Sequence, residues 1–259
     1  MKPAKTAEAI LKSLDLWRLP VDPIAIAKIE GIELLPDKFG DGFDGRIRFI
    51  KEIDSFAISY REQGPGRSLG RVRFTLAHEL GHYYLHKPYL LGGECHSSKT
   101  NFVSKDKMEE EADEFAASLL MPMELFRDRI QLLRSGVASL GNLCRLADDV
   151  FSTSVTSIVR RYCQSDVEPC AAVFSENGRV RWCVFSEDMR RTGMGFIEFG
   201  SNLPEASHTA KLDDPSLSEV EGSIEPWQWF DSPRFEGRLW EEAMRLGQTG
   251  LVLTYLTQQ

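Results

Sequence analysis

The sequence has no long hydrophobic run and no signal for export. The longest apolar segments lie near residues 24–27 and 251–256, far short of the roughly 20 apolar residues that cross a bilayer. The N-terminal residues contain neither the apolar core nor the small-residue cleavage site of a secretory signal. We therefore expect a cytoplasmic protein that does not associate with a membrane.

Cysteine and positive charge are also scarce. Five cysteines occur, and no two of them form a C-x-x-C pair, which disfavours both a disulfide framework and a zinc ribbon. The net charge of −8 and the isoelectric point near 5.3 argue against unspecific attraction to nucleic acid or anionic lipid. Reduced thiols in a cytosol agree with this composition.

The composition is that of a folded protein, with 42% hydrophobic and 27% charged residues in a chain of 259. Helical spacing of apolar residues predicts helices at 7–17, 24–29, 71–86, 107–120 and 122–134, and two short helices within 139–163. Alternating apolar residues predict strands at 43–50, 55–60, 170–174, 179–185, 196–199 and 251–255. We expect an α+β fold with one domain over residues 1–165 and a smaller β-rich domain over residues 166–259.

The segment Phe74–His82 contains the pattern H-E-x-x-H within a predicted helix. At about 100° per residue, His78 and His82 lie about 40° apart on one face, so both imidazoles can reach one metal ion. Glu79 points about 100° away from His78, which suits a general base better than a ligand. Gly81 on the histidine side permits another backbone to approach. The alternative interpretation is a pair of buried histidines that are held by hydrogen bonds alone.

A third ligand decides between these interpretations. A metzincin would have a histidine six residues after His82, but that position is Pro88, which excludes that class. The predicted helix at 107–120 carries Glu109 and Asp113 on its apolar stripe, where unpaired carboxylates would be costly. Zinc would supply a partner for Glu109, and a histidine N–H would supply one for Asp113. The other acids of this helix suit a solvated face: Glu110, Glu111 and Glu114.

For two further features, His86 and residues 143–163, we prefer a structural role to a functional one. His86 stands one turn beyond His82, but three histidines in line along one helix cannot converge on one ion, so we expect a capping or packing role. Residues 143–163 resemble a helix-turn-helix. Because only Arg160 and Arg161 offer obvious phosphate contacts, we prefer two packed helices.

The two motifs together resemble the ImmA/IrrE family of bacterial metallopeptidases. Arg73–His86 carries H-E-x-x-H, and Glu109–Pro122 carries E-x-x-A-D. The similarity extends over roughly residues 5–165. The second motif also resembles that of the membrane-bound CAAX-type peptidases, but the transmembrane helices of that family are missing here.

The resemblance implies a gluzincin-like domain in which His78, His82 and Glu109 hold zinc, with a helical segment behind it. Zinc would activate a water molecule and polarise the scissile carbonyl. Glu79 would take the water proton and pass it to the leaving amine, while Asp113 would orient a histidine ligand. The donor for the oxyanion stays open among four residues: Tyr83, Tyr84, His96 and His208.

The resemblance also implies a regulatory substrate. Such proteases cut a helix-turn-helix transcriptional repressor at a single site and derepress a stress, DNA-damage or phage-defence operon. Some relatives carry a GAF-like sensor domain, with which the segment 170–259 is compatible; single-stranded DNA or a small molecule would be the effector. Two alternatives stay open: a non-catalytic, zinc-containing regulator that binds DNA or a partner, and an aminopeptidase for small peptides. The intact Glu79 speaks against the first.

Cys95 is a candidate inhibitory metal ligand. It follows two glycines and lies thirteen residues after His82 and fourteen before Glu109. A thiolate is a strong fourth ligand for zinc and would displace the catalytic water. We therefore expect that Cys95 can hold the enzyme inactive until the loop moves or the sulfur is oxidised; the alternative is a loop cysteine of no consequence.

Overall fold

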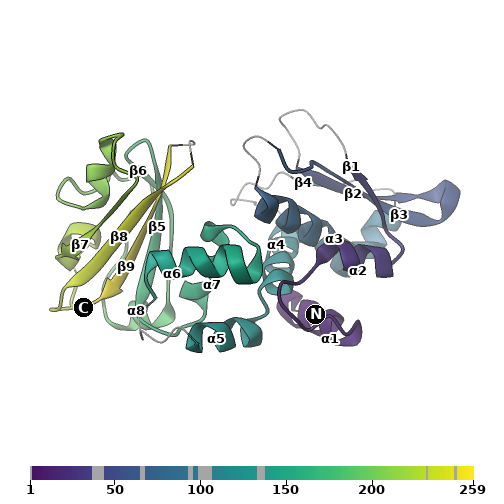
Figure 1. Ribbon diagram of the computed structural model, residues 1–259, viewed down its shortest axis with the longest axis horizontal. Coiled ribbons are helices and arrows are strands. Elements are labelled where there is room, and N and C mark those ends of the chain that lie inside the picture. The colour runs from purple at the N-terminus through teal and green to yellow at the C-terminus, as the bar shows by residue number, and fades with distance from the viewer. Residues whose placement is uncertain are drawn as a thin grey trace. The chain divides into compact units, whose positions relative to one another are not determined.

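The computed structural model describes residues 2–36, 44–64, 68–92, 96–98, 107–132, 138–231, 233–247 and 250–259. Within these ranges the chain forms helices and two separate sheets (Figure 1), so the fold is α+β as the sequence predicts. Two compact units are present: Met1–Leu132 with Arg145–Ser154, and Leu133–Cys144 with Val155–Gln259. Among the described residues we find no helix whose length and apolarity would let it span a membrane.

The first unit has a four-stranded sheet. Its strands lie in the order β1 (Glu33–Pro36), β3 (Ser55–Tyr60), β2 (Gly45–Ile50) and β4 (His96–Ser98). β1 is parallel to β3, whereas β2 is antiparallel to both β3 and β4. Ile47 of β2 and Ile58 of β3 are register partners and are fully buried, so they mark the face of the sheet that points into the core.

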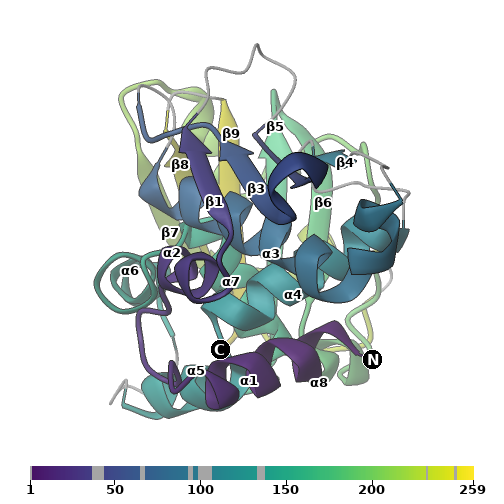
Figure 2. The same ribbon diagram turned by 90° about the vertical axis from the view of Figure 1, so that its right-hand side faces the viewer.

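Helix α3 (Leu69–Leu91) covers this sheet and packs against β2 and β3 (Figure 2). It begins where the side chain of Ser68 accepts a hydrogen bond from the backbone N–H of Arg71, a typical N-cap. The helix departs from helical dihedral angles at His86 (φ −122°, ψ 17°). This kink lies two residues before Pro88, which has no N–H to continue the regular ladder.

Helix α4 (Lys107–Leu120) crosses α3 at a glycine. A Cβ built on Gly81 would lie 3.0 Å from the Cα of Ala112 and 3.2 Å from its carbonyl oxygen. A larger residue at position 81 would therefore require one of the helices to shift. The expectation that Gly81 permits a second backbone to approach is confirmed.

The remaining helices complete the first unit. α1 (Pro3–Ser13) packs against α4, and α2 (Pro23–Ile29) packs against α3 (Figure 2). Three further segments are the 3-10 helix η1 (Lys51–Ile53), α5 (Met123–Gln131) and the π-helix η2 (Leu146–Phe151). The rings of Phe126 and Phe151 join the last two, with centroids 5.3 Å apart.

The second unit has one antiparallel sheet of five strands, in the order β6-β5-β9-β8-β7 (Figure 1). These strands are β5 (Cys170–Glu176), β6 (Arg179–Phe185), β7 (Glu219–Ile224), β8 (Leu239–Leu246) and β9 (Leu251–Gln258). β5 and β9 pair along their whole length near the centre of the sheet, and both are almost entirely buried.

Helices cover both faces of β5. The helical segments beside the sheet are α6 (Leu140–Arg145), α7 (Val155–Gln164), α8 (Glu187–Arg191), the 3-10 helix η3 (Thr209–Asp213) and α9 (Pro226–Trp229). On one face, Ala171 and Val173 join an apolar cluster that includes Met189 of α8. On the other face, the sulfur of Cys170 lies 3.7 Å from that of Cys163 in α7.

The division between the units differs from the boundary expected near residue 165. α7 buries Ile158, Val159 and Tyr162, and it packs against β5 and β6. The hydroxyl of Tyr162 also donates a hydrogen bond of 2.8 Å to Glu168. α7 therefore belongs with the second sheet, whereas residues 145–154 belong with the first unit. The segment 143–163 is helical, as expected, but its parts belong to different units, so the preference for two packed helices over a helix-turn-helix stays a prediction.

The strand expected at 196–199 is wrong. Gly195 (φ +87°) and Gly200 (φ +80°) turn the chain on both sides of the segment, in the left-handed region that glycine tolerates. Phe196 and Phe199 are 58% and 71% exposed, and only Ile197 is buried. The apolar alternation here belongs to a loop. In contrast, the sequence did not predict four of the strands: β1, β4, β7 and β8.

We expect Gly81→Val to lower the free energy of unfolding by about 1–3 kcal/mol, because its side chain overpacks the crossing with Ala112. Chemical denaturation monitored by circular dichroism measures this. Gly141→Ala in α6 is the control, because a Cβ there would have its nearest neighbour 4.0 Å away. It should be neutral or stabilising by up to about 1 kcal/mol. Equal stabilities of the two variants would contradict a tight crossing.

Candidate metal centre

Two imidazoles and one carboxylate converge between α3 and α4. The Nε2 atoms of His78 and His82 are 3.1 Å apart. The carboxylate of Glu109 lies 3.2 Å from each of them, with Oε2 toward His78 and Oε1 toward His82. Within the described ranges, this is the group of His, Cys, Asp or Glu side chains that could hold a metal ion.

The size of this group fits a tetrahedral ion. With bonds of about 2.0–2.1 Å from zinc to nitrogen or oxygen, tetrahedral geometry separates neighbouring ligand atoms by about 3.3 Å. The separations of 3.1 and 3.2 Å are close to that value. Three protein ligands leave the fourth position of a tetrahedron for water or a substrate.

The two histidines are buried and Glu109 is partly buried, and the charges of these groups compensate one another. Burial alone would lower the pKa of His78, but hydrogen bonds with Asp113 and Glu109 raise it to about 10. Burial alone would raise the pKa of Glu109, but hydrogen bonds with His78 and His82 hold it well below its usual range. The carboxylates thus favour positive charge at this point, and a metal cation would meet the same field.

Each converging histidine is also held at its other ring nitrogen. Nδ1 of His78 lies 2.8 Å from Oδ1 of Asp113. Nδ1 of His82 lies 3.1 Å from Nδ1 of His86, and Nε2 of His86 lies 3.1 Å from Oε2 of Glu111. Both histidines therefore present Nε2 to Glu109 and use Nδ1 for a second partner.

The sequence assigned Glu111 to a solvated face, and its side chain is 36% exposed, but its contact with His86 was not predicted. Its carboxylate is half-buried and accepts a hydrogen bond from His86, which lowers the pKa of Glu111. His86 is buried and packs against its neighbours, as expected. The equal spacing of His78, His82 and His86 along α3 is the signal that could have placed His86 beside His82, because residues four apart on a helix are neighbours.

Glu79 lies against the start of β2. Its side chain is fully buried, and a Cβ built on Gly45 would lie 3.0 Å from its Oε1 atom. Gly45 thus leaves room for this carboxylate beside His78. The preceding residue, Asp44, accepts a hydrogen bond of 3.1 Å from Nε of Arg71, which ties β2 to α3 at this point.

The tyrosines that follow His82 face another acidic residue. Tyr83 donates a hydrogen bond of 3.1 Å to Glu30. Burial, and then Glu30, raises the pKa of Tyr84 well above its ordinary value. Helical geometry also places these two residues about 100° and 200° around α3 from His82. The hydroxyl of Tyr83 is therefore engaged by Glu30, whereas the buried hydroxyl of Tyr84 has no hydrogen-bond partner among the described residues.

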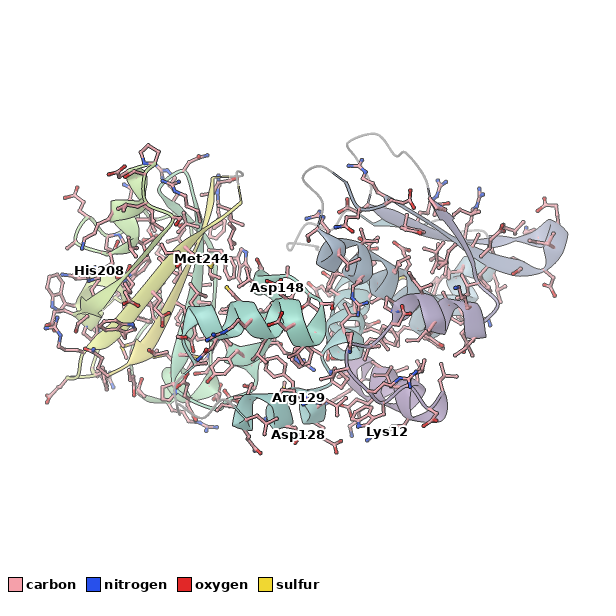
Figure 3. All side chains as sticks on the ribbon, viewed as in Figure 1. Lys12, Asp128, Arg129, Asp148, His208 and Met244 are labelled. Carbon is pink, nitrogen blue, oxygen red and sulfur yellow. The ribbon has the colours of Figure 1, made fainter. Side chains whose placement is uncertain are left out.

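The sequence singles out three other residues, of which the structure describes the side chain of one. Cys95 and the side chain of His96 lie outside the described residues, so the inhibitory role of Cys95 stays a prediction. His208 belongs to the second unit (Figure 3), where its Nε2 lies 3.3 Å from the carbonyl oxygen of Ser223. Its ring occupies the space that a Cβ at Gly222 would need.

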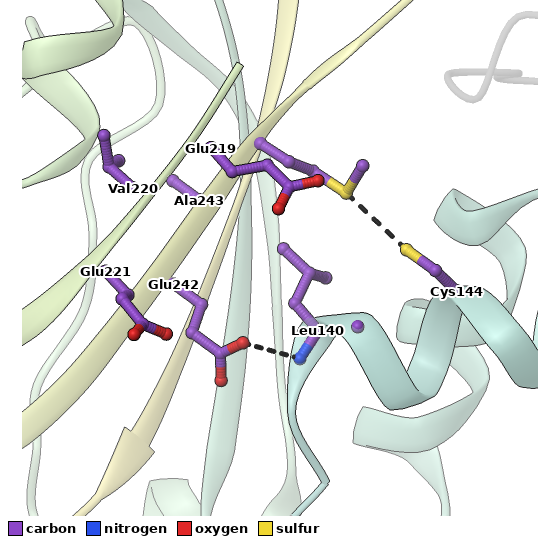
Figure 4. Close-up of a pocket in the computed structure, with 9 residues that line it drawn as sticks. Leu140, Cys144, Glu219, Val220, Glu221, Glu242 and Ala243 are labelled. Atoms are coloured by element: carbon purple, nitrogen blue, oxygen red, sulfur yellow. Dashed lines mark hydrogen bonds between the residues drawn. The ribbon is translucent and has the colours of Figure 1, made fainter. Parts of the chain in front are cut away.

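The second unit contains a pocket of about 320 Å³ beside α6, β7 and β8 (Figure 4). Three carboxylates and two sulfur atoms line it, from Glu219, Glu221, Glu242, Cys144 and Met244. Burial raises the pKa of Glu242, and the negative charge of Glu221 raises it further. A 2.8 Å hydrogen bond from the N–H of Leu140 acts in the opposite direction. Because these carboxylates repel anions, the pocket does not suit single-stranded DNA.

Known proteins are similar to this chain in sequence or in fold. The profile of the IrrE N-terminal-like domain, of peptidase family M78, matches residues 65–161. Metallopeptidase ImmA of Bacillus subtilis (strain 168) is 30% identical over 109 residues, which are 42% of this chain and 59% of that protein. The match thus spans less than two thirds of that relative. A solved Mycobacterium tuberculosis transcriptional regulator has a TM-score of 0.63 at 13% identity, over 99% of this chain and 75% of that one; this likeness concerns the fold alone.

We expect the protein to bind about one divalent metal ion per chain. His82→Ala and Glu109→Ala should lose it, because each removes one of the three converging ligands. Added metal should also raise the melting temperature of the wild type, since it binds only the folded state. Metal content by mass spectrometry and thermal melts measure both effects.

Glu114→Ala is the control, because it removes an exposed carboxylate from the same helix. It should keep the metal. Retention of stoichiometric metal by Glu109→Ala, with loss in Glu114→Ala, would show that the centre is placed wrongly.

Proposed function

We propose that this chain, which belongs to the ImmA/IrrE family through residues 65–161, is a zinc-dependent endopeptidase with a gluzincin-like site. The family resemblance predicted from the sequence is confirmed by the profile match and by the similarity to ImmA. The observation that carries the proposal is the convergence of His78, His82 and Glu109 at separations of 3.1–3.2 Å. The identity of the metal as zinc and the catalytic activity are both proposed.

The donor set favours zinc over the hard cations. Mg²⁺ and Ca²⁺ prefer oxygen ligands, whereas two imidazoles and one carboxylate with an open fourth position are a common catalytic zinc set. When bound, zinc would supply Lewis acidity to a water molecule and to the scissile carbonyl.

The protein side chains would orient the reactants and move the proton. Glu79 follows His78 directly, and its buried carboxylate can accept a proton from water and deliver it to the leaving amine. Asp113 accepts a hydrogen bond from Nδ1–H of His78, which directs Nε2 toward the centre. These roles follow the predictions made from the sequence.

A regulator with a structural zinc site is the alternative function. The buried carboxylate of Glu79 has no purpose in a structural site and is costly to bury. This observation favours the enzyme.

We also propose the substrate class: a helix-turn-helix transcriptional repressor, cut once, whose loss derepresses a stress, DNA-damage or phage-defence operon. Family membership supports a regulatory protease. The second unit, with its own five-stranded sheet, adds surface that a general peptidase does not need, and it is compatible with a GAF-like sensor domain. That the solved protein of similar fold is called a transcriptional regulator agrees with such a role.

Glu79→Gln should keep about one zinc per chain and lose cleavage by a factor of about 10² or more, because it removes the base and no ligand. Metal analysis and a cleavage assay on the same preparation separate the two effects. A variant that binds zinc and cleaves at the wild-type rate would rule out Glu79 as the base.

The purified protein with zinc should cut a folded repressor, taken from the neighbouring gene, at one bond. Mass spectrometry of the products gives the number and position of the cuts. Glu79→Gln serves as the control for contaminating proteases. Digestion of unfolded casein at many positions, or stepwise removal of N-terminal residues from short peptides, would instead indicate a general peptidase or an aminopeptidase.

A further inference from the structure

The contacts of His82 continue beyond the converging ligand atoms to a second histidine and a carboxylate. Nδ1 of His82 lies 3.1 Å from Nδ1 of His86, whose Nε2 lies 3.1 Å from Oε2 of Glu111. We propose that His86 and Glu111 are positioning residues, which fix the tautomer and the orientation of His82 and thereby strengthen metal binding. This inference rests on the proposed metal site.

The direction of each hydrogen bond follows from the groups involved. A carboxylate only accepts, so Nε2 of His86 carries the proton that is shared with Glu111. The other nitrogen of a neutral imidazole is an acceptor, so Nδ1 of His86 accepts from Nδ1–H of His82. Nε2 of His82 faces Glu109 at 3.2 Å, and with zinc bound it would present its lone pair to the ion at the centre of the converging group.

The two converging histidines reach the same tautomer by different means. His78 donates directly to the carboxylate of Asp113 at 2.8 Å. On its Nδ1 side, His82 reaches the carboxylate of Glu111 through the ring of His86. A carboxylate behind each metal-ligating imidazole raises its basicity and fixes its ring. His86 and Glu111 together therefore provide for His82 what Asp113 provides directly for His78.

The backbone of α3 is irregular at the residue that makes this contact. His86 has φ −122° and ψ 17°, outside the helical region, two residues before Pro88. The ring centroids of His82 and His86 are 5.2 Å apart, and their planes are inclined by 51°. This inclination, unlike parallel stacking, lets the N–H of one ring point toward a nitrogen of the other.

A purely structural role makes a different prediction. If His86 only filled space, then an apolar side chain of similar size would replace it without effect on the metal. Glu111 is half-exposed, and its ion pair with Lys107 spans 3.8 Å across the surface of α4, so it contributes little to stability. An effect of Glu111 on metal affinity would therefore come through His86.

The test compares zinc dissociation constants, measured by competition with a chelator, for His86→Leu, His86→Gln, Glu111→Gln and the wild type. His86→Leu should weaken zinc binding by about 10–100-fold, and Glu111→Gln by about tenfold. His86→Gln should restore part of the loss, because its amide can accept from His82 and donate to Glu111. The matched control is Glu110→Gln, the same charge change at the exposed neighbouring position, and its affinity should equal that of the wild type.

A second readout follows the tautomer itself. In ¹⁵N-histidine spectra of the zinc-loaded wild type, His82 should show a protected proton on Nδ1, and His86→Leu should lose that protection. Circular dichroism checks that each variant is folded; if His86→Leu is not, then the half-exposed Glu111→Gln decides. Wild-type zinc affinity in Glu111→Gln and in folded His86→Leu would overturn the inference and leave the proposed function intact. A wild type without zinc binding would overturn both.

Discussion

The close crossing of α3 and α4 is the constraint on which the candidate centre depends. Gly81 lies between the two histidines of H-E-x-x-H, and the backbone of Ala112, one turn after Glu109, occupies the space of its missing side chain. A glutamate side chain is short, so Glu109 can approach both Nε2 atoms to 3.2 Å only if the helices are this close. Metal ions tolerate little variation in ligand distance. A single missing methyl group on α3 thus makes the geometry of the centre possible.

The polar groups around the centre are arranged so that hydrogen-bond partners reduce the free-energy cost of burying them. Buried imidazoles and carboxylates are destabilising unless each polar atom has a partner. Here Asp113 accepts from His78, and His86 and Glu111 continue the chain of contacts from His82. The same partners that reduce the cost of burial also fix which ring nitrogen faces the centre. Stability and ligand orientation therefore have one structural cause in this part of the fold.

The helical part of the site could be predicted from the sequence, because a helix fixes which residues share a face. That rule predicted the pairing of Glu109 with the two histidines. It did not predict the contact of Glu111 with His86, because His86 lies at a kink that the rule does not describe. Strand β8 was missed for a different reason. Glu241 is fully buried there, and it accepts hydrogen bonds from Thr209 and from the indole N–H of Trp229, which lie 32 and 12 residues away. Such partners cannot be seen in a local pattern, so the strand resembles a polar helix.

The connectivity of the chain bears on how the second unit could influence the first. The chain passes between the units three times, since residues 133–144 and 155–259 belong to the second unit and residues 145–154 to the first. Both ends of the segment 145–154 are thus covalently joined to the second unit. Within the first unit, this segment approaches α3 so closely that a Cβ on Gly70 would lie 2.7 Å from the carbonyl carbon of Thr153. Gly70 is in the first turn of the helix that carries His78 and His82. A displacement of residues 145–154 would therefore reach the start of α3 through the non-bonded contact of Thr153 with Gly70, and closely packed groups leave little space to absorb such a displacement.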